Sequence, residues 1–75
     1  MAIHYNIEWM RRNKIGVITI EMVNADVFTF IVEEIKEIDR CENLISISMK
    51  ENHTDEADVF EIMNCNITAI KYRKN

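Results

Sequence analysis

Proline is absent from the 75-residue chain, and glycine occurs once, at Gly16. These residue types mark most tight turns, so we expect short loops built on Asn, Asp and Lys. No apolar run approaches the roughly 18 residues that a membrane span needs. The chain also starts without the basic segment and apolar run of a secretory signal peptide. The sequence therefore predicts a protein without a membrane segment, and we expect a cytoplasmic location.

Cysteine and histidine are scarce, with two of each. Cys41 and Cys65 are too few for a disulfide scaffold and are interpreted as small buried side chains. A pairing between them stays open, because two neighbouring parallel strands would place both at the same end of a sheet. With His4 and His53 they form no CxxC or HxxxH spacing. We predict no metal, no cofactor and no catalytic residue.

The composition is that of a globular protein, with 48% hydrophobic and 29% charged residues. Thirteen acidic and nine basic residues give a net charge of −4. A chain of this length forms one domain, residues 1–75, and buries only about 60% of its unfolded surface. So small a domain rarely holds the cleft that catalysis requires, so we do not expect an enzyme.

Four segments alternate apolar and polar residues with the period of a half-buried strand. They cover residues 2–10, 15–23, 43–50 and 66–73, and the alternation is least regular in the last, where Ile67 and Ala69 oppose Ile70 and Tyr72. Residues 11–14 lie between the first two segments, and we expect a hairpin turn there in which Asn13 is left-handed.

Two further segments carry apolar residues at three- and four-residue spacing, which is typical of helices. The first covers residues 25–39. Its run VFTFIV alone fits a strand, but the following EEIKEID favours a helix. The second begins at Asn52 or Thr54 and has an apolar stripe at Ala57, Phe60 and Met63.

The predicted order is β-β-α-β-α-β, with no internal repeat. The first two strands form an antiparallel hairpin, and strands joined through helices are parallel with right-handed crossovers. We therefore predict an α+β two-layer sandwich, with a four-stranded mixed sheet and two helices on one face.

The face of the predicted sheet that lacks helices is the first candidate binding surface. Its apolar members are Val17, Leu44, Ile70 and Tyr72, and they suit a protein partner or a second copy of the chain. The first or last strand is an uncovered edge that offers another route to a homodimer. Our leading hypothesis is a small non-enzymatic module for protein interaction or regulation.

The acidic layer formed by the two predicted helices is the alternative surface. It contains Glu33, Glu34, Glu37, Asp55, Glu56 and Asp58. Such a layer can imitate a nucleic acid and act as a decoy or inhibitor of a nucleic-acid-binding protein. A simple solvated helix face explains the same residues.

Direct binding of nucleic acid is not expected. The basic residues fall into two groups, Arg11/Arg12/Lys14 and Lys71/Arg73/Lys74. The predicted topology places these groups at opposite ends of the sheet, where they cannot form one stripe along a phosphate backbone.

Overall fold

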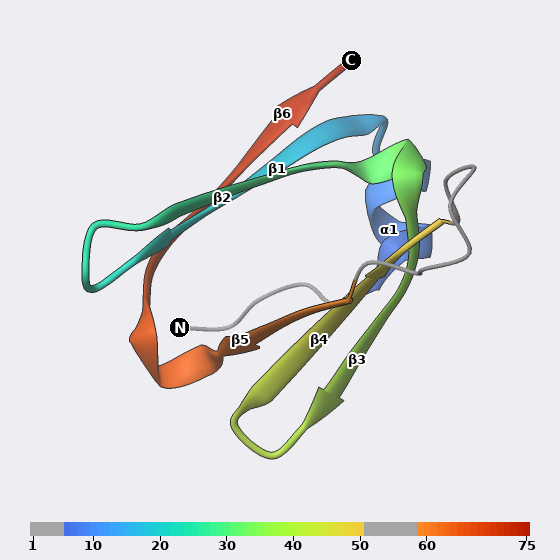
Figure 1. Cartoon of the computed structure of the whole chain (residues 1–75). Coiled ribbons are helices and arrows are strands. Elements are labelled where there is room, and N and C mark those ends of the chain that lie inside the picture. Colours follow the sequence, from blue (N-terminus) through green and yellow to red (C-terminus); the bar gives the residue numbers. More distant parts are fainter. Residues whose placement is uncertain (1–5, 51–58) are drawn as a thin grey trace.

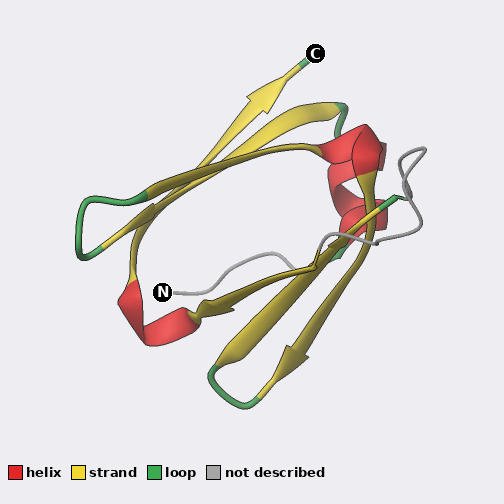
Figure 2. Ribbon diagram, in the orientation of Figure 1, coloured by secondary structure: helices red, strands yellow, loops and turns green. Residues whose placement is uncertain are grey.

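The computed structural model describes residues 6–50 and 59–75. This part of the chain contains six β-strands in two antiparallel three-stranded sheets, one short α-helix and two 3-10 turns (Figures 1 and 2). The protein is therefore mostly β. The predicted four-stranded mixed sheet with two helices on one face is wrong.

The first sheet has the strand order β2-β1-β6. Its central strand β1 (Ile15–Met22) pairs with β2 (Val27–Ile31) on one side and with β6 (Ile67–Lys74) on the other. The strands predicted at 15–23 and 66–73 are thus confirmed, but they are antiparallel neighbours.

The second sheet has the order β3-β4-β5. Its central strand β4 (Leu44–Met49) pairs with β3 (Ile35–Cys41) and β5 (Val59–Met63). The strand predicted at 43–50 is confirmed. Phe60 and Met63 lie on β5, so this end of the second predicted helix is wrong, and the rest of it falls outside the described residues.

Two 3-10 turns carry the chain from one sheet to the other. The turn η1 (Val32–Glu34) joins β2 to β3, and η2 (Asn64–Asn66) joins β5 to β6. In Figure 2 they are the red corners between the two sheets. The helix predicted at 25–39 is consequently two strands with a turn between them.

Burial explains why a helical spacing was misleading in this segment. The helical pattern places Ile31 in the core, but this side chain is 49% exposed. Phe30 and Val32 are 4% and 1% exposed and flank it. Alternate residues are therefore buried, as in a strand with one face on the core.

The helix α1 (Ile7–Arg12) replaces the described part of the strand predicted at 2–10. Asn6 caps its start, because the side-chain oxygen accepts hydrogen bonds from the backbone N–H groups of Glu8 and Trp9 at 2.9 and 3.2 Å. The predicted hairpin turn at 11–14 is instead the end of this helix. The left-handed residue there is Lys14, with φ of 57°, and not Asn13.

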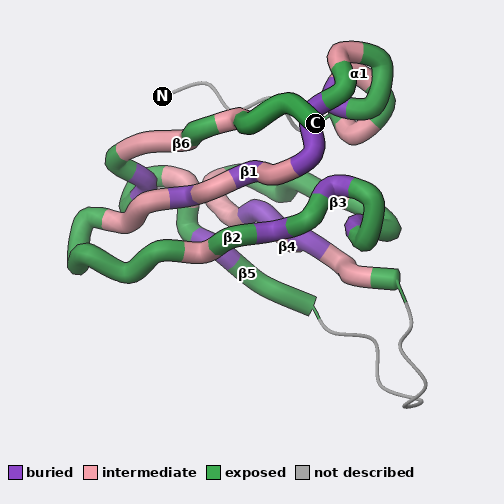
Figure 3. The backbone as a smooth tube through the Cα atoms, turned by 90° about the horizontal axis from the view of Figure 1, so that it is seen from above, coloured by how far each residue is buried: buried purple, intermediate pink, exposed green. Residues whose placement is uncertain are grey.

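One core lies between the two sheets (Figure 3). The central strands supply its middle, with Ile18 and Ile20 from β1 facing Ile45 and Ile47 from β4. Met10 of α1 is completely buried at one side. The remaining buried residues of the cluster are Ile15, Phe30, Val32, Ile35, Ile62 and Ile67.

The structure contains an internal repeat, contrary to the prediction. The letters ADVF at residues 25–28 return at 57–60, 32 positions later, and η1 and η2 have the same separation. The unit β1-β2-η1-β3 thus matches the unit β4-β5-η2-β6.

Strand registers follow the same pseudo-two-fold relation. Ile20 lies opposite Phe28 and Ile70, and its counterpart Ile47 lies opposite Phe60 and Ile38. A backbone hydrogen bond of 2.8 Å from Val23 to Asn66 has its counterpart from Lys50 to Glu34, also at 2.8 Å. The two units therefore share backbone geometry as well as the letters ADVF.

Candidate functional site

The four strands at the sheet edges lie on two sides of the molecule. The side formed by β3 and β6 is covered by α1, which contacts β3 and η1. Trp9 of this helix packs edge-on against Tyr72 of β6, with ring centroids 5.9 Å apart. Arg11 donates a hydrogen bond of 3.3 Å to the carbonyl of Ile35 at the start of β3. The side formed by β2 and β5 lies opposite α1 and β6 in Figure 3.

Aromatic rings pack between the two sheets at β2 and β5. Phe30 of β2 meets Phe60 of β5 edge-on at 5.3 Å between ring centroids. Phe28 stacks along β2 against Phe30 at 6.5 Å. These rings join the two sheets where no helix of the described chain does so.

Exposed apolar side chains gather on the same two strands. Among the described residues, six large hydrophobic side chains are exposed, and five of these belong to β2 or β5. Val27 and Ile31 lie on the outer face of the first sheet, and Val59 and Met63 lie on the outer face of the second. We name these residues of the two edge strands, taken together, the open side. It consists of Val27, Ile31, Val59, Phe60 and Met63.

The outer backbone edges of β2 and β5 have no partner strand within residues 6–50 and 59–75. In an antiparallel pair, every second residue of a strand is hydrogen-bonded to the neighbouring strand. A hydrogen bond from Met22 N–H to the carbonyl of Asp26 shows which residues of β2 these are. Phe28 and Phe30 therefore turn their N–H and C=O groups to β1. Val27, Thr29 and Ile31 present theirs outward, which creates a template for an additional strand.

The four residues predicted for one sheet face are not brought together. Val17 lies on the outer face of the first sheet, and Leu44 lies on the outer face of the second. Ile70 and Tyr72 of β6 pack against the core instead. Two of the four adjoin the open side, because Val17 lies opposite Ile31 in the β1–β2 pair and Leu44 lies opposite Met63 in the β4–β5 pair.

The predicted acidic layer also loses its helices. Glu33 and Glu34 lie on η1, and Glu37 lies on β3. Asp55, Glu56 and Asp58 fall outside the described residues. A smaller acidic group does form on the second sheet, where Asp39 and Glu61 flank Ser46 in one row of its outer face.

The two basic groups lie at the same end of the first sheet, which corrects the predicted separation. Lys74 of β6 pairs with Ile15 of β1, and the N–H of Asn75 donates to the carbonyl of Lys14 at 2.9 Å. The antiparallel pairing of β1 with β6 causes this meeting. A cavity of about 330 Å³ opens there. Its lining is Arg11, Lys14, Ile15, Gly16, Ile31, Val32, Glu33 and Asn75.

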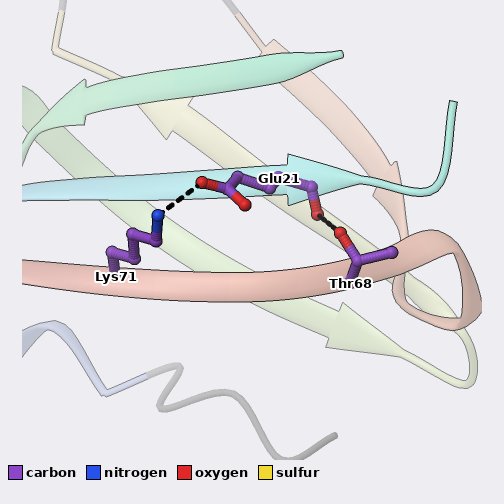
Figure 4. Close-up of polar contacts among 3 residues, drawn as sticks. All are labelled: Glu21, Thr68 and Lys71. Atoms are coloured by element: carbon purple, nitrogen blue, oxygen red, sulfur yellow. Dashed lines mark hydrogen bonds and ion pairs between the residues drawn. The ribbon is translucent and has the colours of Figure 1, made fainter. Parts of the chain in front are cut away.

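Acidic residues balance part of the positive charge of the two basic groups. Glu21 forms an ion pair with Lys71 at 2.8 Å, and its backbone carbonyl accepts a hydrogen bond of 3.1 Å from the Thr68 hydroxyl (Figure 4). The carboxylate of Glu33 shares the cavity with Arg11 and Lys14.

Both cysteines are exposed and free, so their expected burial is wrong. The N–H of Cys65 donates to the side-chain oxygen of Asn43 at 2.9 Å, which fixes the turn η2 against the β3–β4 hairpin. Among the described residues, no three or more His, Cys, Asp or Glu side chains are grouped so that they could hold a metal ion. No described helix is long and apolar enough to cross a membrane.

Comparisons of this chain with protein families, with curated proteins and with solved structures found no match. The open side itself was missed by our sequence reasoning. Two signals could have found it: the alternation in VFTFIV and the repeated letters ADVF.

Proposed function

We propose that this chain is a small non-enzymatic interaction module that binds a protein partner through its open side. The observation that carries this proposal is a coincidence of two features on β2 and β5. These strands hold five of the six exposed large hydrophobic side chains among the described residues, and their outer edges have no partner strand there. An extended apolar segment that adds to either of these edge strands satisfies both features at once.

The energetics favour such a partner. Edge N–H and C=O groups can give an added strand its backbone hydrogen bonds. Burial of Val27, Ile31, Val59 and Met63 contributes about 25 cal/mol for each Å² of apolar surface removed from water. A regulatory role follows if the bound segment belongs to an enzyme or a transcription factor. We place the module in the cytoplasm, because reducing compartments keep exposed thiols such as Cys41 and Cys65 unpaired.

Affinity capture with the full chain tests this proposal. Val59→Lys combined with Met63→Lys introduces charge on β5, where both side chains are exposed. We expect the fold to be retained, because exposed substitutions rarely change stability by more than about 0.5 kcal/mol. We expect a partner that is retained in high salt by the wild type to bind the double variant at least tenfold more weakly. Titration calorimetry with the purified partner measures this change.

Val23→Lys is the matched control. Val23 is 61% exposed, compared with 54% for Val59, but it lies in the β1–β2 turn and not on an edge strand. This variant should bind the partner as tightly as the wild type does. Equal affinity of wild type and double variant would contradict the proposal.

An acidic decoy is the second candidate, and one observation favours it. Asp39, Ser46 and Glu61 form a row across the outer face of the second sheet, with Glu37 on the same face. In the same capture experiment, a decoy would bind a basic protein in low salt only, because screening weakens contacts between exposed charges. The Val59/Met63 variant would not disturb that binding.

We do not propose that the chain binds nucleic acid directly. The chain carries thirteen acidic residues against nine basic ones. Glu21 pairs with Lys71 toward the other end of the first sheet, and Glu33 lines the cavity at the basic end. These carboxylates repel a phosphate backbone.

A further inference from the structure

Charge distinguishes the four edge strands of the described structure. β3, β5 and β6 each contain charged residues, and β2, with the sequence VFTFI, contains none. Charged side chains on an edge strand prevent pairing with another chain, because they would be buried or placed beside like charges. β2 is therefore the unprotected edge.

The pseudo-two-fold relation makes the comparison of β2 with β5 direct. Thr29 occupies the centre of the outer edge of β2, and Glu61 occupies the equivalent position on β5. Each is flanked by exposed apolar residues, Val27 and Ile31 on β2. The same backbone position is thus neutral on one edge and negatively charged on the other.

We propose that β2 pairs antiparallel with β2 of a second copy of this chain, with the two-fold axis beside Thr29. This proposal rests on the proposed function and names a partner for one strand of the open side. In this register Thr29 faces Thr29 of the partner subunit, and Val27 faces Ile31 of the partner subunit. All three residues present their N–H and C=O groups to the new ladder.

The pairing suits the side chains that it brings together. Opposed threonines and opposed β-branched residues are favourable cross-strand pairs. Val17 lies beside Ile31 and extends the apolar strip across each sheet. The same pairing through β5 would set Glu61 against Glu61 of the partner subunit, and directly opposed like charges are unfavourable.

Sedimentation equilibrium over a concentration series tests the proposal. The wild-type chain should show a monomer–dimer equilibrium. Thr29→Glu and Thr29→Lys should each raise the dissociation constant at least about tenfold, because each places like charges opposite one another. An equimolar mixture of the two variants should dimerise again, since a carboxylate would then lie opposite an ammonium group, and high salt should weaken that heterodimer. Misfolding of the variants would not produce this rescue.

Thr19→Glu is the matched control. Thr19 lies beside Thr29 on the outer face of the same sheet, but on the central strand β1. In the dimer the two β1 strands would be three strand spacings apart, about 14 Å. This distance exceeds the Debye length of about 8 Å at physiological salt. The dissociation constant should therefore stay within about twofold of the wild-type value.

Amide hydrogen exchange of the wild-type chain provides a test without substitutions. The N–H groups of Val27, Thr29 and Ile31 should become protected as concentration rises, and that of Glu61 should not. A chain that stays monomeric up to about 1 mM would overturn the dimer, because a dissociation constant of about 1 mM corresponds to a binding free energy of only about −4.1 kcal/mol. So would a dimer that is unaffected by the substitutions at Thr29. Neither result alters capture through Val59 and Met63, so failure of the dimer and failure of the proposed function are distinguishable.

Discussion

Within residues 6–50 and 59–75, three non-glycine residues hold the left-handed conformation that usually favours glycine. Lys14, Ala25 and Glu42 have φ values of 57°, 72° and 54°, and the single glycine, Gly16, is not among the positive-φ positions. An L-residue in this region costs roughly 1–2 kcal/mol. The scarcity of glycine therefore leaves strain in the turns. Our expectation that Asn, Asp and Lys build the loops is confirmed at Lys14 and in the β1–β2 turn, where Asn24 accepts a hydrogen bond from the N–H of Asp26, but it did not identify Ala25 or Glu42 as left-handed.

Ala25→Gly should stabilise the protein. The substitution removes the steric cost at φ of 72°, and part of this gain is offset by the greater freedom of glycine in the unfolded chain. We expect the free energy of unfolding to rise by about 0.5–1 kcal/mol. Urea denaturation followed by far-UV circular dichroism measures this change.

Ala69→Gly is the control for that substitution. Ala69 is half-buried in β6 and does not have a positive φ. Glycine in a strand should lower the free energy of unfolding by about 0.5–1 kcal/mol. If both variants lose stability equally, strain at Ala25 is not the cause of the first effect.

Alternation was the reliable signal for the elements of this protein. It located β1 and β4 and, from a less regular alternation, β6. It failed for α1, whose start depends on the cap by Asn6, and the alternating pattern of the preceding residues hid that signal. At Val27–Cys41 we preferred the helical spacing to the alternation. The turn η1 interrupts the alternation of buried and exposed residues between β2 and β3, and the buried positions on its two sides together resemble the spacing of a helix.

Pairing of distant strands was not available from local pattern. The residues of β6 do not indicate that Ile70 will lie opposite Ile20 of β1. The meeting of the two basic groups at one end of the first sheet depends on that pairing. The repeat of ADVF was the one signal in the sequence that related distant segments. With it, an equivalent strand-turn-strand unit could be predicted for both halves, and the open side follows from the pair of ADVF strands.

The helix α1 should stabilise the whole fold through one side chain. Met10 is completely buried, and the substitution Met10→Ala leaves a cavity between α1 and the sheets. We expect the free energy of unfolding to fall by about 2–5 kcal/mol. Arg12→Ala, on the exposed side of the same helix, should change it by less than about 0.5 kcal/mol. Similar losses in the two variants would contradict the role of Met10 in joining α1 to the core.

At the scale of the molecule, neither repeat unit can bury its own apolar face. β1 needs β6 of the other unit, and β4 needs β3. The turns η1 and η2 each carry the chain from one sheet into the other, so each sheet takes strands from both units and both enclose the same core (Figure 1). The two sheets should therefore unfold together.

Equivalent substitutions in the two sheets test this cooperativity. Ile18 in the first sheet and Ile45 in the second are related by the pseudo-two-fold and are both buried. Ile18→Ala and Ile45→Ala should each reduce the free energy of unfolding by about 2–5 kcal/mol. Trp9 is the single tryptophan and packs on Tyr72 of the first sheet, so its fluorescence reports that sheet. Since a single core implies two-state unfolding, Ile45→Ala should shift the urea midpoint equally by fluorescence and by circular dichroism. A fluorescence midpoint that Ile45→Ala leaves unchanged would mean that the sheets unfold separately.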